Sequence, residues 1–278
     1  MRVIRAEAMG MCFGVRDALQ IAATIEEPLS VTIHGELVHN ATVLQGLEAR
    51  GFGMVAEQRR DGVPGTPAVM VTAHGISDAE RSRLRGAGKA LIDTTCPLVR
   101  RVHEAAQRLA ADGCHVVVIG RRGHVEIRGI VEDLFSYTVI ERVSEVETWP
   151  VRRIGVISQS TAAARDVAAV RAAVIQHNRH AQVRFVDTVC RPTKERQVAL
   201  ERLLDAVPAV VVVGGRNSNN TRRLVVRCME RGILAQHVQG PGDLDLAALR
   251  AFDTVGLTAG TSTPDDVIDA VASALEAL

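Results

Sequence analysis

The sequence is poor in aromatic residues and has no charge bias. Its 278 residues include five Phe, one Trp and one Tyr, and 33 basic side chains stand against 32 acidic ones, for a formal net charge of +1. Proteins that bind nucleic acid by base stacking need more aromatic rings and a basic surface. Polyanion and membrane-surface partners also favour a strong positive charge. The composition therefore predicts no nucleic-acid partner and no membrane-surface partner.

Long apolar segments are also missing. The longest clean apolar run, residues 206–213, is interrupted by Pro208, whereas a membrane-spanning helix needs about 20 apolar residues. The first residues lack the apolar centre of a secretory signal. A hydrophobic content of 47% excludes disorder as the main state. We therefore predict a cytoplasmic protein without a membrane span, in which thiols stay reduced.

The third absence is any Cys-x-x-Cys pair. The five cysteines stand at positions 12, 96, 114, 190 and 228. An odd number with these spacings argues against a disulfide framework and against a zinc ribbon. Cys114 begins a predicted strand and Cys228 lies in a predicted helix, so we expect both to be buried structural residues. The other three lie in predicted loops between a strand and a helix.

A repeated pattern of apolar strand, polar loop and helix indicates the fold. The strands lack period-2 alternation, which is typical of parallel strands covered by helices on both faces. The clearest of them are Val69–Thr72, His115–Ile119, Ile154–Ile157, Val210–Val213 and Thr254–Leu257. Segments with helical spacing follow them at 97–111, 161–180, 194–206, 220–232 and 264–278. This alternation predicts α/β architecture with mainly parallel sheets.

The spacing of three cysteines suggests an internal repeat. Cys12, Cys96 and Cys190 are 84 and 94 residues apart, and each lies between a predicted strand and a predicted helix. We predict three similar α/β units, with Cys12 in the first and with Cys96 and Cys190 at the two boundaries between units. The units cover residues 1–96, 97–190 and 191–278, with the C-terminal segment packing back on the first unit.

The position of these cysteines favours metal chemistry. The N-terminus of a helix favours the thiolate form of a nearby cysteine, and thiolates are the ligands of iron–sulfur clusters. Three thiolates that meet at a common axis would leave one iron of a four-iron cluster open to a substrate. The competing interpretation is three unrelated loop cysteines.

Three histidines share a loop context. His39, His74 and His124 follow predicted strands and have small or polar neighbours. Three imidazoles that donate hydrogen bonds would suit an anionic group such as a diphosphate. The alternative for each is a turn or a helix cap.

Uncharged donors precede two predicted helices. Ser218, Asn219 and Asn220 precede one helix and Ser262 precedes another, and both places suit a phosphate at a helix N-terminus. Glu126 stands two residues after His124, and in an extended loop the two side chains would point the same way. Glu126 would then deliver protons to a site lined by His124. A surface role for Glu126 is the alternative.

Taken together, these motifs resemble the LytB family of 4-hydroxy-3-methylbut-2-enyl diphosphate reductases. The matching motifs occur in the family's order and cover nearly the whole chain. They are Gly10–Val15, Glu36–Asn40, Ala73–Ser77, Asp93–Val99, Gly123–Glu126, Cys190–Gln197, Gly214–Asn220 and Thr258–Asp265.

The resemblance implies a fold, a cofactor and a reaction. It implies three α/β domains in a pseudo-threefold trefoil around a [4Fe–4S] cluster, with Cys12, Cys96 and Cys190 as the cluster ligands. The implied reaction is the last step of the non-mevalonate isoprenoid pathway. Two electrons and protons remove the substrate's hydroxyl group as water, which gives isopentenyl and dimethylallyl diphosphates. The implied electron donor is a ferredoxin or a flavodoxin-type protein.

The resemblance also assigns roles to side chains. Glu126 corresponds to the proton-delivering carboxylate, and Ser160 corresponds to an active-site threonine. His124 belongs to the catalytic group as well as to the diphosphate site. The residues implied at the diphosphate are His39, His74, His124, Ser218, Asn219, Asn220 and Ser262.

Four departures from the family pattern keep other functions open. Val125 replaces the usual proline, Ser160 the usual threonine and Asn219 the usual serine, and Met11 and Phe13 flank Cys12. A divergent paralogue that reduces another allylic or aryl alcohol is therefore the second hypothesis. A non-enzymatic iron–sulfur sensor is the third, and a zinc hydrolase would need a compact ligand spacing that the sequence lacks.

Overall fold

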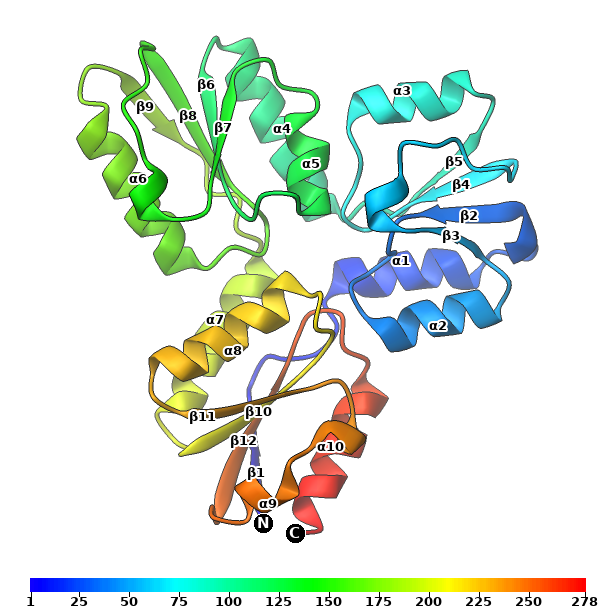
Figure 1. Ribbon diagram of the computed structural model, residues 1–278, viewed down its shortest axis with the longest axis vertical. Coiled ribbons are helices and arrows are strands. Elements are labelled where there is room, and N and C mark those ends of the chain that lie inside the picture. The colour runs from blue at the N-terminus through cyan, green and yellow to red at the C-terminus, as the bar shows by residue number, and fades with distance from the viewer. The chain divides into compact units, whose positions relative to one another are not determined.

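The structure is a computed structural model that describes the backbone of residues 1–278 and every side chain except that of Gln58. The described chain forms three four-stranded sheets, and every strand pair that joins neighbours in them is parallel (Figure 1). The predicted α/β class with three parallel-sheet units is confirmed.

The first sheet along the chain has the strand order β3-β2-β4-β5. Its strands are β2 (Val31–His34), β3 (Gly53–Val55), β4 (Ala68–Val71) and β5 (Ala90–Asp93). The helices of this region are α1 (Phe13–Ala23), α2 (Ala41–Ala49) and α3 (Asp78–Gly86). The Ser77 hydroxyl accepts the Glu80 backbone N–H, so Ser77 caps α3 at its N-terminus.

The second sheet has the order β7-β6-β8-β9. Its strands are β6 (His115–Ile119), β7 (Tyr137–Ile140), β8 (Arg153–Ser158) and β9 (Gln182–Phe185). Its helices are α4 (Pro97–Ala111), α5 (Val125–Val131) and α6 (Ala164–His177). The predicted helix over 97–111 is confirmed at both ends. Pro97 favours the start of the helix, because the first turn does not need the backbone N–H that proline lacks.

The third sheet joins the two ends of the chain, with the order β1-β12-β10-β11. Its strands are β1 (Arg2–Arg5), β10 (Ala209–Val213), β11 (Leu234–Val238) and β12 (Thr254–Ala259). Its helices are α7 (Arg191–Leu204), α8 (Asn219–Glu230), α9 (Leu246–Leu249) and α10 (Asp265–Glu276). Short 3-10 turns occupy Pro28–Ser30, Glu57–Arg59, Val143–Glu145 and Pro241–Asp243.

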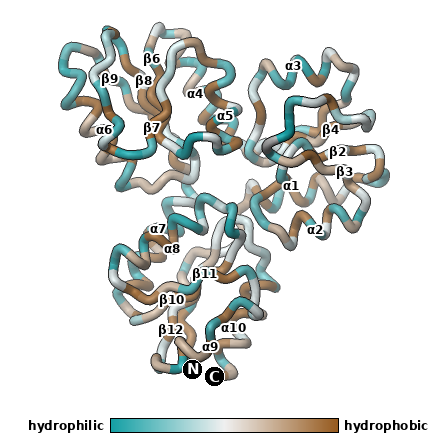
Figure 2. The backbone as a smooth tube through the Cα atoms, in the orientation of Figure 1, coloured by the Kyte–Doolittle hydropathy of each residue, from teal (hydrophilic) through white to brown (hydrophobic). Residues whose placement is uncertain are grey.

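The inner strands of the sheets are buried on both faces, as their sequences predict, whereas edge strands such as β1 and β9 are partly exposed. All five residues of β10 are fully buried, and four of the five in β6 are buried. Hydrophobic colour follows β6 and β8 in Figure 2. Helix α4 packs on β6 and β8, and α8 packs on β10 and β11. This covering by helices explains why the strands carry apolar side chains at successive positions.

The contacts divide the chain into two compact units. The terminal unit comprises Met1–Arg16, His39–Val43 and Arg191–Leu278, and the central unit comprises Asp17–Val38 and Leu44–Cys190. β1 pairs only with β12 in the described sheet, so residues 2–5 share a sheet with the C-terminal third. Among the described helices, none is both long and apolar enough to cross a bilayer.

Candidate functional site

Every candidate residue follows the carboxyl end of a parallel strand. In α/β proteins this edge of the sheet is where ligands bind, because loops and helix N-termini converge there. The central unit holds His74, Cys96, His124, Glu126, Ser160 and Cys190. The terminal unit holds Cys12, His39, Ser218, Asn219, Asn220 and Ser262. The candidates therefore form two groups, each with its own geometry.

Three of the five cysteines precede helices. Cys96 is the N-cap of α4, and Cys12 and Cys190 directly precede α1 and α7. The Cys12 carbonyl accepts the Arg16 N–H at 3.1 Å, which closes the first turn of α1. These three cysteines form no disulfide and are partly exposed, so they are placed to act as ligands or nucleophiles.

The other two cysteines have the predicted structural role. Cys114 and Cys228 are free and buried. Burial raises the pKa of the Cys228 thiol to about 12, so this residue stays protonated near neutral pH.

The carboxyl group of Glu126 is held by Ser160. The Ser160 backbone N–H donates to Glu126 Oε1 at 2.6 Å, and the Ser160 hydroxyl donates to Oε2 at 2.8 Å. Glu126 is 1% exposed and Ser160 is 4% exposed. These two candidates, 34 residues apart in sequence, thus form one buried pair that links the start of α5 to the end of β8.

The prediction of an extended loop at His124 was wrong. Val125–Val131 is helix α5, and His124 is its N-cap, whose Nδ1 accepts the Glu126 backbone N–H at 3.2 Å. Val125 occupies the first helical position of α5, a place at which proline is also favoured. His124 and Glu126 remain close neighbours through this cap.

Two of the three candidate histidines meet in the central unit. The rings of His74 and His124 lie edge to face, with centroids 5.8 Å apart. The Cys96 backbone N–H donates to the carbonyl of Ala73, the residue before His74, at 3.0 Å. The Cys190 backbone N–H likewise donates to the Ser160 carbonyl at 2.9 Å. Each cysteine of this unit is therefore tied by its backbone to a loop that carries another candidate.

The charge at the Cys96 loop is balanced by arginines. Asp93 accepts hydrogen bonds from Thr95 and lies 2.9 Å from both Arg81 and Arg100. Burial alone would raise the pKa of Asp93, but the Thr95 hydrogen bonds and Arg81 hold it below its usual value. The carboxylate is thus fixed as an anion and orders the turn that ends at Cys96.

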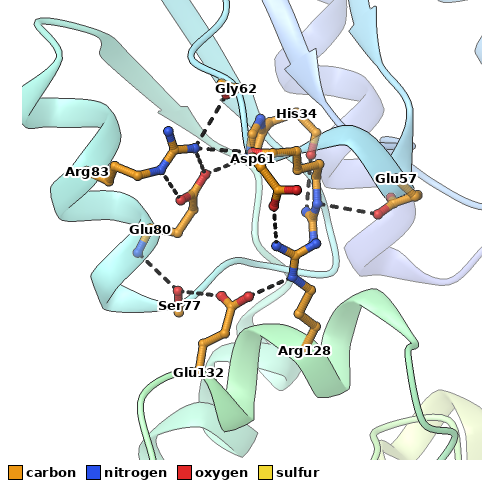
Figure 3. Close-up of polar contacts among 10 residues, drawn as sticks. His34, Glu57, Asp61, Gly62, Ser77, Glu80, Arg83, Arg128 and Glu132 are labelled. Carbon is orange, nitrogen blue, oxygen red and sulfur yellow. Dashed lines mark hydrogen bonds and ion pairs between the residues drawn. The ribbon is translucent and has the colours of Figure 1, made fainter.

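A network of polar residues lies between α3 and α5 in the central unit (Figure 3). The imidazole of His34, fully buried, lies 2.8 Å from Glu80, which also binds Arg83 at 2.6 Å. Burial, and then the charge of Arg60, lower the pKa of His34. Burial would raise the pKa of Glu80, but the hydrogen bonds and charge of Arg83 outweigh it and hold it low. His34 is therefore favoured as a neutral ring beside an anionic Glu80.

The same network reaches α5. Arg128 on α5 binds Asp61 at 3.0 Å, and Glu132 at the end of α5 accepts the Ser77 hydroxyl at 2.8 Å (Figure 3). Asp133 accepts the backbone N–H groups of Asp78 and Ala79 at the start of α3. We call Ser77, Asp61, Arg128, Glu132 and Asp133 the α3–α5 latch. It ties the helix that carries Glu126 to the start of α3 and to the loop that holds Asp61.

The terminal unit contains a cradle at the start of α8. Ser218 is the N-cap of α8, and its hydroxyl accepts the Thr221 N–H at 3.3 Å. Asn220 is 3% exposed, and its Nδ2 has no hydrogen-bond partner among the described residues. The same holds for Thr221 Oγ1 and Thr258 Oγ1. A buried amide and hydroxyls left in this state at a helix N-terminus point to a polar ligand.

Two glycines let the neighbouring loops approach Thr221. A Cβ atom on Gly260 would lie 2.0 Å from Thr221 Oγ1, and one on Gly214 would lie 2.7 Å from it. Gly214 also has φ +152°, a backbone conformation that favours glycine. Thr221 was not a candidate from the sequence. Its position three residues after the Ser218 cap, between two glycine-containing loops, is the signal that would have found it.

His39 and Ser262 are brought together through the backbone of His39. The Ser262 hydroxyl donates to the His39 carbonyl at 3.1 Å. Gly215 approaches the same carbonyl so closely that a Cβ atom there would lie 2.4 Å from the oxygen. The loop after β2, the loop after β10 and the loop after β12 therefore meet in one place within the terminal unit.

Gln159 is a second residue that the sequence did not single out. It is 1% exposed, and its Oε1 accepts the Arg121 N–H at 3.2 Å, which fixes the loop that leads to His124. Gly120 allows this contact, since a Cβ there would lie 2.8 Å from Gln159 Cβ. Its place between two serines of a polar loop was the available signal. Among the described side chains, no three His, Cys, Asp or Glu residues are already clustered as a metal site.

The comparisons with known proteins agree with the sequence motifs. The model of a family described as "LytB protein" matches residues 3–276. A relative from Anaeromyxobacter sp. (strain Fw109-5) is 36% identical, and the match covers 100% of this chain and 98% of that protein. A relative from Chlamydia pneumoniae is 33% identical over 100% of this chain and 91% of that protein. Both relatives are named 4-hydroxy-3-methylbut-2-enyl diphosphate reductase.

Solved structures show the same likeness. The structure of the E-1-hydroxy-2-methyl-but-2-enyl-4-diphosphate reductase from Plasmodium falciparum matches with a TM-score of 0.88 at 25% identity, covering 98% of this chain and 87% of that one. A second structure, of an (E)-4-hydroxy-3-methyl-but-2-enyl diphosphate reductase described as the terminal enzyme of the non-mevalonate pathway, matches with a TM-score of 0.68 at 29% identity over 100% of both chains. These names support the main functional prediction, and none supports the alternatives.

Proposed function

The chain belongs to the LytB protein family, and from this premise we propose that it is an oxidoreductase acting on 4-hydroxy-3-methylbut-2-enyl diphosphate. Two electrons and two protons cleave the allylic C–O bond. The hydroxyl group leaves as water, and isopentenyl or dimethylallyl diphosphate remains. The observation in the molecule that carries the proposal is the buried Glu126 carboxyl group, bonded to Ser160 at 2.6 and 2.8 Å and adjacent to the His124 cap.

The donor set of the chain fits an iron–sulfur cluster. Cys12, Cys96 and Cys190 form no disulfide, are partly exposed and stand directly before helices, whereas the other two cysteines are buried. Helix N-termini favour thiolates, which are the ligands that iron–sulfur clusters require. We propose that these three residues hold one [4Fe–4S] cluster. When bound, such a cluster supplies the electrons and a Lewis-acidic iron for the hydroxyl oxygen.

Glu126 would protonate the hydroxyl group of the substrate, and Ser160 would orient Glu126. An allylic hydroxyl group is a poor leaving group until it is protonated, so an acid within hydrogen-bond reach lowers the barrier. The Ser160 hydroxyl lies 2.8 Å from Glu126 Oε2. When Glu126 Oε2 carries a proton, the hydrogen bond between these two oxygens can orient that proton. The Ser160 N–H on Oε1 fixes the rotation of the carboxyl group. The buried pair is thereby held in one orientation before the substrate arrives.

The diphosphate would be held at a distance from the reacting carbon. The terminal unit offers the N-terminus of α8 with Ser218, Asn219 and Asn220, and the loop with Ser262 and His39. The central unit offers His74 and His124. Backbone N–H groups and amide donors at a helix N-terminus bind phosphate oxygens. Binding there would fix the hydroxyl end in one place and so lower the entropic cost of the reaction.

The proposal includes the remaining sequence predictions. These are the trefoil of three units, divided at 96/97 and 190/191, with the three thiols at its axis, and a ferredoxin or flavodoxin-type electron donor. They also include a cytoplasmic location, which suits three reactive thiols that must stay reduced. The likeness to the Plasmodium reductase over 98% of the chain supports the trefoil.

The first experiment is anaerobic turnover. Protein reconstituted with iron and sulfide would be incubated with 4-hydroxy-3-methylbut-2-enyl diphosphate and a strong one-electron donor. We expect isopentenyl and dimethylallyl diphosphates, identified by mass. An intact cluster without product would overturn the assignment of this substrate.

The cofactor is tested separately through the cysteines. Cys12→Ala, Cys96→Ala and Cys190→Ala should each lose most of the bound iron, measured per chain after reconstitution. Cys114→Ala is the matched control and should retain it, because Cys114 is a buried structural residue. Retention of iron by Cys12→Ala together with loss by Cys114→Ala would reverse the ligand assignment.

A further inference from the structure

Helix α7 carries an arginine whose charge is buried. Arg196 is 6% exposed, and its Nη2 donates to the Gly10 carbonyl at 2.5 Å and more weakly to the Met9 carbonyl at 3.4 Å. Its Nη1 donates to the Pro192 carbonyl at 3.0 Å. All of these residues belong to the terminal unit. A buried guanidinium group is costly unless carbonyl or carboxylate oxygens surround it, so these bonds are needed to keep it in place.

The bonds of Arg196 end on the loop that leads to Cys12. Gly10 has φ +74°, and a Cβ atom there would lie 2.9 Å from Ile268 Cδ1, so this turn has little room to change. Two residues later, the Cys12 N–H donates to the Thr261 carbonyl at 3.0 Å. The loop is therefore held on one side by the end of β12 and on the other by Arg196.

The fork of the guanidinium group explains why arginine stands here. Its two terminal nitrogens bond to opposite partners at once: Nη1 to the first turn of α7, and Nη2 to the loop before Cys12. A lysine has one ammonium group on a flexible stem and cannot span both with a fixed geometry. Pro192 lies four residues before Arg196 in α7, so the geometry of the helix itself places the Pro192 carbonyl near the Arg196 side chain.

We propose that Arg196 is a positioning residue that fixes the backbone of residues 9–12 and thereby presents the Cys12 thiol in one orientation for the cluster. The inference rests on the proposed function for the role of Cys12 as a ligand. The placement of the thiol itself does not depend on that function. α7 begins at the residue after Cys190, which is a second proposed ligand. The same helix therefore follows one proposed ligand directly and carries the arginine that supports the loop of another.

The test compares the three thiols within one chain. Full-length protein without cluster would be alkylated under anaerobic conditions, and the rate at Cys12, Cys96 and Cys190 would be read separately by mass. In Arg196→Lys and Arg196→Gln we expect the Cys12 rate to change by about 10-fold or more, the size expected when a hydrogen bond to a charged group is lost. The rates at Cys96 and Cys190 should stay within about twofold of the wild type, as independent sites do.

The matched control lies on the same helix. Arg202 pairs with Glu7, but its side chain is 66% exposed, so Arg202→Gln should leave all three rates unchanged. Low-millimolar guanidinium should partly restore the wild-type Cys12 rate in Arg196→Ala, a rescue that general loss of stability would not show. Equal changes at all three thiols would reveal a merely structural role and overturn the inference, and so would an unchanged Cys12 rate.

Cluster retention gives the second measurement. After reconstitution, Arg196→Lys should release iron to a chelator at least several-fold faster than Arg202→Gln, followed by loss of cluster absorbance. Failure of the proposed function would show differently: wild-type protein would bind no cluster or turn over no substrate, while the Cys12 labelling difference would persist. Unchanged labelling in a protein with a working cluster would overturn the role of Arg196 alone.

Discussion

Glu126 in the central unit and Asn220 in the terminal unit are both almost completely buried polar side chains, at 1% and 3% exposure. They differ in how the protein satisfies them. Ser160 bonds to both oxygens of Glu126, while the amide nitrogen of Asn220 has no partner among the described residues. Burial of an amide group without a hydrogen-bond partner lowers the free energy of unfolding.

This difference fits the two roles that we propose for Glu126 and Asn220. A group that transfers a proton must be oriented before the substrate arrives, so the fold supplies its partners. A group that binds an anion must keep its donors available, so the fold leaves them without partners until the ligand binds. The supports differ accordingly. The α3–α5 latch and the polar network lie between α3 and α5 (Figure 3), whereas Gly214 and Gly260 approach Thr221 in the terminal unit.

The largest expected effect tests the proton-transfer side. Glu126→Gln keeps the shape and can still accept the Ser160 N–H, but it cannot supply a proton. We expect turnover to fall by about 10² to 10⁴-fold with KM little changed, as measured by anaerobic steady-state kinetics. Ser160→Ala should cost only about 10-fold, because the backbone bond to Oε1 remains. Glu104→Gln, an exposed change in the same unit, is the control, and full activity of Glu126→Gln would remove Glu126 from the reaction.

The next effect tests the binding side. Asn220→Ala should raise KM by about 10- to 100-fold with kcat nearly unchanged, because a donor to the diphosphate is lost. Its stability to urea should not fall. Asn178 is the matched buried asparagine, and it bonds to the Trp149 N–H and to the Val174 carbonyl. Asn178→Ala should therefore lower the free energy of unfolding by about 1–3 kcal/mol without changing KM. If Asn220→Ala destabilised the protein as much as Asn178→Ala, the contrast would be wrong.

A smaller effect tests the glycine support. Gly260→Ala would place Cβ 2.0 Å from Thr221 Oγ1, so we expect a loss of about 1–3 kcal/mol in the free energy of unfolding by urea. Adding Thr221→Ala should recover much of this loss, because the clashing hydroxyl is gone. Gly242→Ala, where a Cβ meets nothing within 4 Å, should change stability little. If the losses in the free energy of unfolding from the two substitutions were simply additive, Thr221 would not be the residue with which the new Cβ atom clashes.

The smallest effect tests the polar network. His34 has a lowered pKa, so the unfolded chain binds its proton more readily, and the stability that the neutral ring contributes is lost as pH falls from about 6.5. Glu80, whose pKa is also lowered, acts in the same direction at lower pH. His34→Gln should cost about 1 kcal/mol at pH 7 and should lessen the difference between urea midpoints at pH 7 and pH 5. His177→Gln, on the exposed end of α6, should keep the wild-type difference.

Local patterns were enough to predict the fold, but not every element of the site. Apolar runs such as Ala209–Val213 are strands because both of their faces are buried, and Pro97 marks a helix start by its own geometry. The start of α5 was missed because His124 caps it through a ring nitrogen, while the usual capping residues are Ser, Thr, Asp and Asn. The pairing of Glu126 with Ser160 joins residues 34 apart, and no local pattern encodes that contact.

The buried Arg196 illustrates a further limit of the sequence. On a helical pattern an arginine is expected on the exposed face, but the carbonyl groups of Gly10 and Pro192 favour burial of this one. The contact between Arg196 and Gly10 spans 186 residues. Such contacts follow from the packing of the whole terminal unit, so they are visible only in three dimensions.

The pairing of β1 with β12 has a consequence for synthesis of the protein. β1 is made first, but its partner strand β12 is made almost last. The Cys12 N–H likewise has to bond to the carbonyl of Thr261, which is made after β12. On the ribosome, the first and second sheets can form while β1 has no partner, since domains generally fold as their residues emerge. The Cys12 loop therefore takes its final shape only after translation of β12, so binding of the proposed cluster would follow completion of the chain.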